Sequence, residues 1–283
     1  MEVKPLNLFP FCGADNIFVI NIVYHLSERF RKIRRRFVRK IRTPVTAHLL
    51  SILFSFLFLP SRFVEKTRLA VPQTGKPAMA YFARENAVTR LYNDLQLADA
   101  GLSKHAFESA YKGYQKLLKR QKLANPCILT ICDLSQSSNK KRLYILDLEQ
   151  NKILMTSYVA HGRGSGGEYA SRFSNYNHSH QTSLGFYITS STYYGENGLS
   201  LRLLGLEPGF NDRATRRSIV IHGAGYIGDD YLLSNKFMGR SYGCPAVPRD
   251  VCEEVIDLIK DGTCLFIYHP TKKYLQRSRL LNG

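Results

Sequence analysis

The sequence predicts a mainly β domain with a helical N-terminal extension and one late helix. Between Glu85 and about Lys122, apolar residues recur at the spacing typical of amphipathic helices. After Pro126 the pattern changes to short apolar runs separated by turn-forming residues, which predicts strands. The composition, 44% hydrophobic and 22% charged over 283 residues, is that of a globular chain that can bury a sizeable core.

The first 61 residues contain a basic stretch followed by an apolar one. Arg29 to Arg42 reads RFRKIRRRFVRKIR, and Thr43 to Ser61 contains no Asp, Glu, Lys or Arg. The strongly apolar part, Leu49 to Leu59, is shorter than the roughly 20 residues that a spanning helix needs. Residues 1–61 are therefore expected to act as a signal peptide or a signal anchor. The basic flank on the N-terminal side predicts export of the rest of the chain to the periplasm or cell envelope.

Two other interpretations of this segment stay open. A core helix behind a basic surface helix would also be apolar, although core helices rarely lack polar residues over four turns. The basic stretch is longer than an ordinary signal n-region, and a misplaced start codon would explain its length.

The formal charge of +18 is concentrated near the N-terminus. Residues 1–70 hold 13 Lys or Arg and 4 Asp or Glu, which is half of the excess. This basic run adjoins the apolar segment, and no aromatic–basic interleaving of a nucleic-acid module follows, so no nucleic-acid partner is expected. Membrane contact is expected only through the N-terminal segment. The remaining excess suits an anionic polymer such as a cell wall.

The helical extension is predicted over residues 81–124, after a linker over residues 62–80 that contains VPQTGKP. A first helix over Glu85 to Leu97 is broken by Gly101, and Ser103 is a suitable N-cap for a second helix to about Lys122. Apolar residues of this second helix share one face, which is typical of packing: Phe107, Tyr111, Tyr114, Leu117 and Leu118.

The remaining domain, residues 125–283, is predicted to be β-rich. A hairpin connection is expected at Ser135 to Lys141, and one helix over Val251 to Ile259 with Asp250 as its cap and Gly262 as its stop. Strands are expected at Cys127–Cys132, Leu143–Leu148, Ile153–Ala160, Leu184–Thr189, Leu199–Leu204, Ser218–His222 and Cys264–His269.

Neither the cysteines nor the glycines indicate a metal or nucleotide site. The chain has no CxxC pair, which argues against structural zinc. Gly162, Gly164 and Gly167 match G-x-G-x-x-G, but neither a helix nor a suitably spaced acidic residue follows, so a loop is the better interpretation. His178 and His180 lie in a polar loop without Cys or carboxylate neighbours. Free buried thiols are expected at Cys127, Cys132, Cys252 and Cys264.

One pair of residues, unlike the features above, indicates catalytic chemistry. A predicted strand ends at His222, and Cys244 follows 22 residues later within GRSYGCPAVP. A cysteine nucleophile needs a partner base and surroundings that favour the thiolate. Arg240 would add positive potential, Gly243 would remove bulk beside the sulfur, and backbone N–H groups around Tyr242 to Cys244 are suited to an oxyanion hole. The alternative is a core cysteine and an unrelated histidine.

The sequence of this segment resembles that of the L,D-transpeptidase catalytic domain family, the YkuD-like cysteine enzymes of bacterial peptidoglycan. The usual signature is a His, an interval, then Ser/Thr-His-Gly-Cys; here a longer interval separates His222 from Ser241-Tyr242-Gly243-Cys244, with Tyr242 where His is usual. The chain is most similar to the branch with a G-R-S-x-G-C-P segment. That branch is also similar at SLGFYIT (183–189), TYYGENGLSLRLLGLEPGFND (192–212) and IVIHGA (219–224).

The resemblance covers about residues 127–270 and implies a YkuD-like β-sandwich catalytic domain. By position, it implies Cys244 as nucleophile, His222 as base, and the backbone carbonyl of Gly223 as the group that orients the imidazole. It places Arg240, Ser241, Tyr242 and Gly243 in the substrate-binding or oxyanion region, and it requires neither a metal nor an organic cofactor.

The reaction that the resemblance implies starts on a peptidoglycan tetrapeptide stem. The cysteine attacks the carbonyl of the third residue, a diamino acid, terminal D-alanine leaves, and a thioester remains. An amine of a second stem resolves it to a crosslink, and an amine of an envelope protein would anchor that protein. Water as acceptor would make the enzyme an L,D-carboxypeptidase.

Other enzyme classes fit less well. A sortase-like transpeptidase needs an Arg on a strand shortly after the cysteine, whereas Arg249 is predicted to begin a helix. Papain-like and cell-wall endopeptidase folds place Cys before His, the reverse of the order found here. A non-catalytic wall-binding module of the same fold remains as an alternative, although an intact Cys244 and His222 speak against it.

Overall fold

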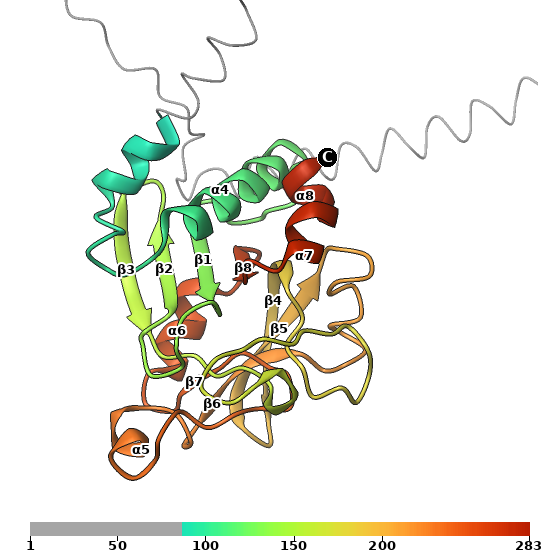
Figure 1. Ribbon diagram of the computed structural model, residues 1–283. Coiled ribbons are helices and arrows are strands. Elements are labelled where there is room, and N and C mark those ends of the chain that lie inside the picture. The colour runs from blue at the N-terminus through green and yellow to red at the C-terminus, as the bar shows by residue number, and fades with distance from the viewer. Residues whose placement is uncertain (1–86) are drawn as a thin grey trace, which may run out of the picture. The chain divides into compact units, whose positions relative to one another are not determined.

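The computed structural model describes residues 87–283 (Figure 1). The chain divides into two units, residues 1–76 and 77–283, and each is considered by itself. The predicted export segment and linker, residues 1–80, lie outside the described residues, so their roles stay predictions. Within residues 87–283, no helix is both long enough and apolar enough to cross a membrane.

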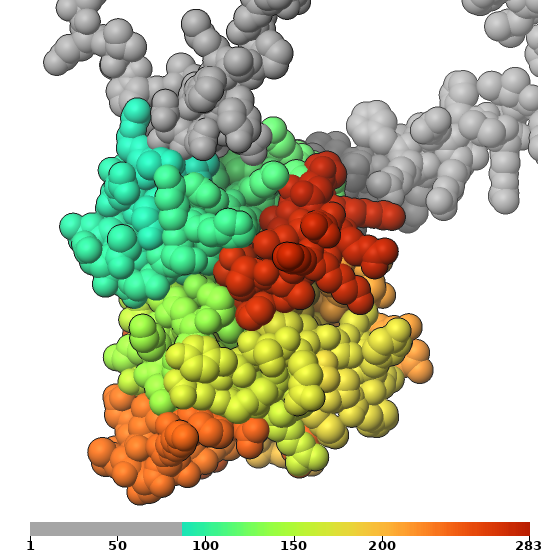
Figure 2. All heavy atoms as spheres, viewed as in Figure 1, coloured from blue at the N-terminus to red at the C-terminus, as the bar shows by residue number. Residues whose placement is uncertain are grey.

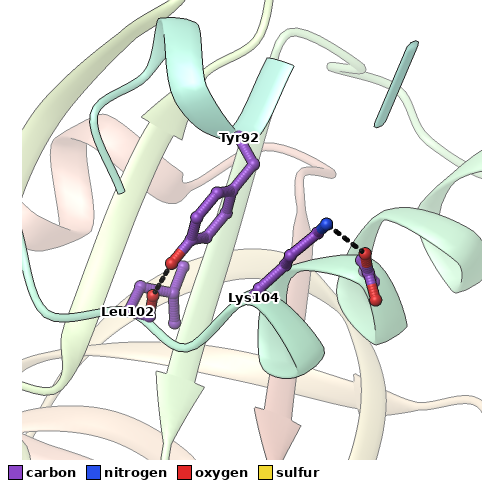
Figure 3. Close-up of polar contacts among 4 residues, drawn as sticks. Tyr92, Leu102 and Lys104 are labelled. Atoms are coloured by element: carbon purple, nitrogen blue, oxygen red, sulfur yellow. Dashed lines mark hydrogen bonds and ion pairs between the residues drawn. The ribbon is translucent and has the colours of Figure 1, made fainter. Parts of the chain in front are cut away.

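Two helices open the described part of the chain. The first covers residues 87–94, and the second, α4, covers Lys104–Lys119. As predicted, Ser103 is the N-cap of α4, and its hydroxyl accepts a hydrogen bond from the amide of Ala106. Figure 3 shows how the connection is fixed: the Tyr92 hydroxyl donates to the Leu102 carbonyl at 2.6 Å.

The predicted apolar face of α4 packs against the core. Phe107, Tyr114 and Leu117 are buried, and Tyr111 and Leu118 pack against the same cluster. The exposed side carries an ion pair between Lys104 and Glu108 at 3.7 Å, also drawn in Figure 3. A pair of this kind, exposed and one helical turn apart, contributes only about 0.3–0.5 kcal/mol, so burial rather than charge holds the helix in place.

Eight strands form one continuous sheet in the order β3-β2-β1-β8-β4-β5-β6-β7. Pairing is antiparallel except at β1–β8 and β6–β7, which are parallel. The bounds are β1 Ile128–Asp133, β2 Leu143–Asp147, β3 Lys152–Ser157, β4 Gly185–Gly195, β5 Gly198–Gly205, β6 Val220–Ala224, β7 Ala246–Pro248 and β8 Cys264–Tyr268. The mainly β fold with a helical N-terminal extension is confirmed.

The long strand β4 joins the two halves of the sheet. Its first residues, Gly185 to Ile188, pair with β8, and its later part pairs with β5 through Gly195. The register shifts between Thr189 and Thr192, and an irregularity of this kind bends a strand and increases its twist. Figure 1 shows β1–β3 and β4–β7 as two regions that run in different directions, as expected for strands that pass between two layers.

All seven predicted strands are present, and one strand was not predicted. β7 has three residues and ends in Pro248, which lacks an amide hydrogen for ladder pairing. It is tolerated there because β7 lies at the edge of the sheet and pairs only with β6.

The predicted late helix is α6, Cys252–Ile259, but its cap differs from the prediction. Val251 occupies the N-cap position without a side-chain hydrogen bond, so the expectation that Asp250 caps the helix is wrong. The chain turns after α6 at Gly262, whose φ of 88° suits glycine. Three short helices were not predicted: α5 (Asp229–Ser234), α7 (Lys272–Arg277) and α8 (Arg279–Asn282). Figure 2 shows α7 and α8, in red, packed between the N-terminal helices and the rest of the domain.

Three of the four free cysteines in residues 87–283 are buried. Cys132, Cys252 and Cys264 are buried free thiols, as expected. The expectation for Cys127 is wrong, because that residue is half-buried and disulfide-bonded. Among the free cysteines of residues 87–283, only Cys244 is partly open to solvent.

Candidate active site

β6 positions His222. Every residue of β6 is buried, and the His222 side chain is only 5% exposed. Nδ1 of its ring donates to the carbonyl oxygen of Gly223 at 3.0 Å. Because a carbonyl oxygen can only accept, this bond assigns the proton to Nδ1 and leaves Nε2 as the basic nitrogen.

Gly223 lies where a side chain would be crowded by the start of α6. A Cβ at this position would lie 3.1 Å from Cβ of Cys252 and 3.2 Å from Cα of Arg249. The start of α6 therefore packs directly on the backbone that holds His222. The glycine permits this approach, and its carbonyl fixes the imidazole.

The parallel pairing of β6 with β7 places the turn that carries Cys244 near His222. His222 lies opposite Ala246, and Cys244 precedes Ala246 by two residues, in a bend just before β7. The thiol is directed to the carbonyl oxygen of Ser218 at 3.6 Å, and no hydrogen bond joins it to His222 within residues 87–283.

Ser241 and Gly243 shape the turn that carries Cys244. The Ser241 hydroxyl donates to the Cys244 carbonyl at 2.6 Å and accepts from the Gly243 amide at 3.0 Å. Gly243 has a φ of 126°, a region that L-residues rarely adopt. Ser241 is 4% exposed, so it holds the turn from the inside rather than facing substrate.

The hydrogen bonds of this turn reduce the predicted oxyanion donors from three backbone amides to two. The amide of Gly243 is already bonded to Ser241, whereas the amides of Tyr242 and Cys244 have no acceptor among the described residues. Two neighbouring free N–H groups beside a nucleophile are the arrangement that stabilises an oxyanion. The two amides that flank Gly243 are therefore the candidates.

Arg217 is the cation next to this turn, and its role was not predicted from the sequence. Its guanidinium donates to the carbonyl oxygens of Ser174 at 2.8 Å and Gln181 at 2.6 Å, to the Ser179 hydroxyl at 3.3 Å, and to the Ser183 hydroxyl. A Cβ on Gly243 would lie 3.2 Å from Nη2. Arg217 therefore ties the 174–183 loop to the turn that carries Cys244.

Burial and charge set the protonation of the pair. Burial raises the pKa of the Cys244 thiol above its usual 9.0, and the backbone of Val220 and the charge of Arg217 oppose this shift. Burial lowers the pKa of His222 below its usual 6.5, and the hydrogen bond to Gly223 opposes it. Both shifts favour a neutral thiol and a neutral imidazole in the resting protein.

Arg240 lies elsewhere than expected. Its guanidinium donates to the Gly166 carbonyl at 3.0 Å and lies 5.5 Å from the Phe237 ring. The charge that opposes the raised pKa of the Cys244 thiol is that of Arg217, and positive potential from Arg240 stays a prediction. A substrate contact by Arg240 stays a prediction.

Tyr242 points outward from the turn. Its side chain is 65% exposed, with the Arg163 guanidinium 4.6 Å and the His180 ring 4.8 Å from its ring centre. The three side chains form an exposed cluster beside Cys244, and this position is compatible with the predicted substrate contact. The cluster joins the glycine-rich loop and the histidine-containing loop, which the sequence treated as unrelated to the site.

Two buried residues, His161 and Arg142, stabilise the turn that carries Cys244. The amide of Ser241 donates to the His161 carbonyl at 3.1 Å, and Arg142 donates to Nδ1 of His161 at 2.8 Å. Burial, followed by the charge of Arg142, lowers the pKa of His161 to about 3, so this histidine stays neutral. Its backbone carbonyl holds the turn through the Ser241 amide.

A thiol and an imidazole held by a backbone carbonyl are groups that nucleophilic acyl transfer can use. Residues 98–268 match the sequence model of the YkuD_2 family, described as the L,D-transpeptidase catalytic domain. The chain belongs to this family. No curated protein matches it.

Solved L,D-transpeptidases show only a distant likeness. L,D-transpeptidase 3 from Mycobacterium tuberculosis is 13% identical with a TM-score of 0.33, over 50% of this chain and 61% of that one. The L,D-transpeptidase from Xylanimonas cellulosilytica is 17% identical with a TM-score of 0.29, over 50% and 60%. Pgp2 from Campylobacter jejuni, a helical cell shape determining protein, is 16% identical with a TM-score of 0.34, over 52% and 48%. The chain thus spans about half to three fifths of these chains, and the family assignment rests on the sequence match.

Proposed function

We propose that this protein is an exported peptidoglycan L,D-transpeptidase whose nucleophile is Cys244. The observation that carries the proposal is the position of two residues: Cys244 lies two residues before the β7 residue that pairs with His222, whose ring is held by the Gly223 carbonyl. Membership in the L,D-transpeptidase catalytic domain family supports the substrate class.

The first half-reaction makes a thioester. Nε2 of His222 takes the thiol proton while the sulfur attacks the carbonyl carbon of the third stem residue. The negative charge on the carbonyl oxygen is met by the amides of Tyr242 and Cys244. The imidazolium then gives its proton to the nitrogen of terminal D-alanine, the peptide bond breaks, and the acyl group remains on sulfur.

The second half-reaction uses the same base. An acceptor amine attacks the thioester carbon and gives its proton to His222, and the proton returns to the departing sulfur, which restores the resting site. An amine from a second stem gives a crosslink, and an amine from an envelope protein would anchor that protein. The exposed cluster of Arg163, His180 and Tyr242 is the surface that an acceptor would meet beside the thiol.

The proposal is tested by incubating the full-length protein with a purified disaccharide-tetrapeptide and analysing the products by mass spectrometry. We expect loss of one D-alanine and a dimer linked between two third residues. The Cys244→Ala variant should form neither product. A monomeric tripeptide alone would favour the L,D-carboxypeptidase alternative, and an unchanged substrate would favour a wall-binding module.

A second readout reports the thiol directly. A solved L,D-transpeptidase is described in complex with imipenem, a carbapenem. Incubation of this protein with imipenem should add one drug mass to the peptide that contains Cys244. Cys132 and Cys264 serve as internal controls, because both are fully buried and should stay unmodified in the folded chain. Equal modification of all three would show unfolding rather than a reactive site.

A further inference from the structure

Two segments of the described chain contain no acidic residue. They are residues 109–132, which include the greater part of α4 and β1, and residues 262–283, which run from β8 through α7 and α8. Together they hold nine Lys or Arg. Residues 87–283 hold 25 Lys or Arg and 17 Asp or Glu, so the 16 cations outside the two segments are balanced by acids. The positive excess of this part of the chain therefore comes from the two segments.

The fold brings these two segments together. α4 contacts α8, and Nζ of Lys116 donates to the carbonyl oxygen of Arg279 at 3.5 Å. Figure 2 shows the C-terminal helices, in red, bordering the green part of the chain that contains α4. Lys112, Lys116 and Lys119 follow one another at four and three residues, so they lie on one side of the helix. The solvent-facing cations of this basic surface are Lys112, Lys116, Lys119, Arg120, Lys122, Arg277 and Arg279.

The charges of the basic surface are not neutralised by neighbouring acids. Lys112, Lys119 and Arg277 form no ion pair within residues 87–283. A carboxylate borders the surface only near its edge, where Asp261 precedes Gly262, whose carbonyl accepts from the amide of Ala124 at 3.1 Å. Like charges gathered on one surface repel one another, so the cluster becomes favourable when it meets an anionic partner.

The basic surface lies away from the candidate active site. Figure 1 shows α4, α7 and α8 at one end of this unit, and α5, β6 and β7 toward the other. His222 belongs to β6, and the turn that carries Cys244 leads into β7. A partner bound at α4 and α8 therefore leaves the reacting pair open.

The sequence before the described residues favours a membrane as this partner. The apolar stretch that is predicted to enter the membrane ends at Ser61, 25 residues before the first described helix. Those 25 residues span at most about 90 Å, so an anchored chain would hold the helices close to the lipid. They carry five Lys or Arg and two Glu, the same sign of charge as the basic surface. Clustered cations near an anionic lipid surface are attracted to it, and a short connection strengthens a weak contact.

We propose that the basic surface docks on the anionic phospholipid headgroups of the membrane, which directs the candidate active site away from the membrane and toward the wall. Ammonium and guanidinium groups pair with phosphate oxygens, and no closed pocket is needed for this. The docking is a second membrane contact, in addition to the one expected of the N-terminal segment. It goes beyond the proposed reaction and does not depend on it.

The test measures the exposure of single lysines in the full-length protein on lipid vesicles. The protein is reconstituted into vesicles of phosphatidylcholine alone or mixed with phosphatidylglycerol, and then treated with a neutral amine-acylating reagent. Mass spectrometry gives the labelling of Lys112 and Lys119 relative to two exposed controls, Lys236 just after α5 and Lys140, whose neighbour Asn139 donates to the Lys236 carbonyl at 3.1 Å.

We expect this ratio to fall about fivefold on the anionic vesicles and to recover in 1 M salt, where charges are screened beyond about 3 Å. An equal ratio on both kinds of vesicle would overturn the proposal. Protection of Lys112 by a soluble anionic polysaccharide, without protection on anionic vesicles, would also overturn it and assign the surface to a wall polymer.

Two triple variants of the full-length protein provide a matched comparison, because each removes three exposed charges. The first changes the basic surface and is Lys112→Gln, Lys119→Gln and Arg279→Gln. The second changes the end that holds α5 and is Lys140→Gln, Lys141→Gln and Lys236→Gln.

Lys122 stays in both variants and reports the contact. On anionic vesicles its labelling should rise to the phosphatidylcholine level in the first variant and stay low in the second. The same labelling of Lys122 in both variants would show that net charge, rather than this surface, brings the protein to the lipid, and would overturn the docking. Neither measurement requires turnover, so the docking and the proposed function can fail separately.

Discussion

The guanidinium of Arg217 donates to the backbone carbonyl of Gln181 at 2.6 Å, close to the turn that carries Cys244. Its other bonds go to Ser174, Ser179 and Ser183, all acceptors of one loop. A single half-buried cation thus aligns a loop and opposes the effect of burial on the thiol pKa.

Arg217→Met should slow modification of Cys244 by imipenem at least about tenfold, because it removes the charge and leaves the loop carbonyls without donors. Arg217→Lys should keep the charge and lose the fork of hydrogen bonds. The pH dependence of thiol alkylation separates the two effects. It should move to higher pH in Arg217→Met and much less in Arg217→Lys. Arg216→Met is the control, and an identical profile for all three variants would remove the electrostatic role.

The pH dependence of kcat/KM should reflect a neutral pair rather than an ion pair. The pKa of His222 is lowered from 6.5, so the imidazole is already the free base at neutral pH. The pKa of Cys244 is raised from 9.0, so the thiol keeps its proton until His222 removes it. Activity should rise through a pKa below 6.5 and then stay flat to about pH 8, measured with the disaccharide-tetrapeptide. A continued rise between pH 7 and 9 would instead indicate attack by preformed thiolate.

Gly243→Ala should reduce turnover strongly while the protein stays folded. A side chain at a φ of 126° is strained by at least about 1–2 kcal/mol, and the new Cβ would lie 3.0 Å from the Gln181 carbonyl. Relief of the strain would rotate the two free amides that flank residue 243. Gly225→Ala is the control, because no atom lies within 4 Å of a Cβ there. Product mass spectrometry should show loss only in the first variant.

Glu207 should make stability depend on pH. The buried carboxyl accepts from the Phe186 amide at 2.9 Å and the Tyr274 hydroxyl at 2.8 Å, and it joins β4 to α7. Burial raises its pKa above 4.5, and the hydrogen bonds oppose the shift. The native state therefore binds this proton more tightly than the unfolded chain, so the contribution of this carboxyl to stability is greatest below pH 4.5 and is lost as pH rises through the native pKa.

Glu207→Gln removes this titration and also disturbs the hydrogen bonds. The informative quantity is therefore the slope of the unfolding free energy against pH, and not its value at one pH. Urea unfolding from pH 4 to 8 should show the wild type losing stability relative to Glu207→Gln as pH rises. Parallel curves for the two proteins would contradict the assignment of a raised pKa to this carboxyl.

The sequence by itself located most of the elements and predicted the candidate reacting residues. Helical spacing and Ser103 located α4, alternation of apolar runs and turns located seven strands, and the His222 to Cys244 segment indicated the family and the chemistry. These features are local, because a cap, a periodicity or a motif is written within a few neighbouring residues.

Only the tertiary structure showed which residues lie around Cys244 and His222. Arg217 lies 27 residues before Cys244 in sequence, and His161 lies 83 before it, yet both contact its turn. Arg240, four residues away, points elsewhere. Strand pairing and loop packing set these neighbours, and burial sets the protonation of the thiol and the imidazole. Burial depends on how the whole sheet closes, so no local pattern in the sequence could reveal it.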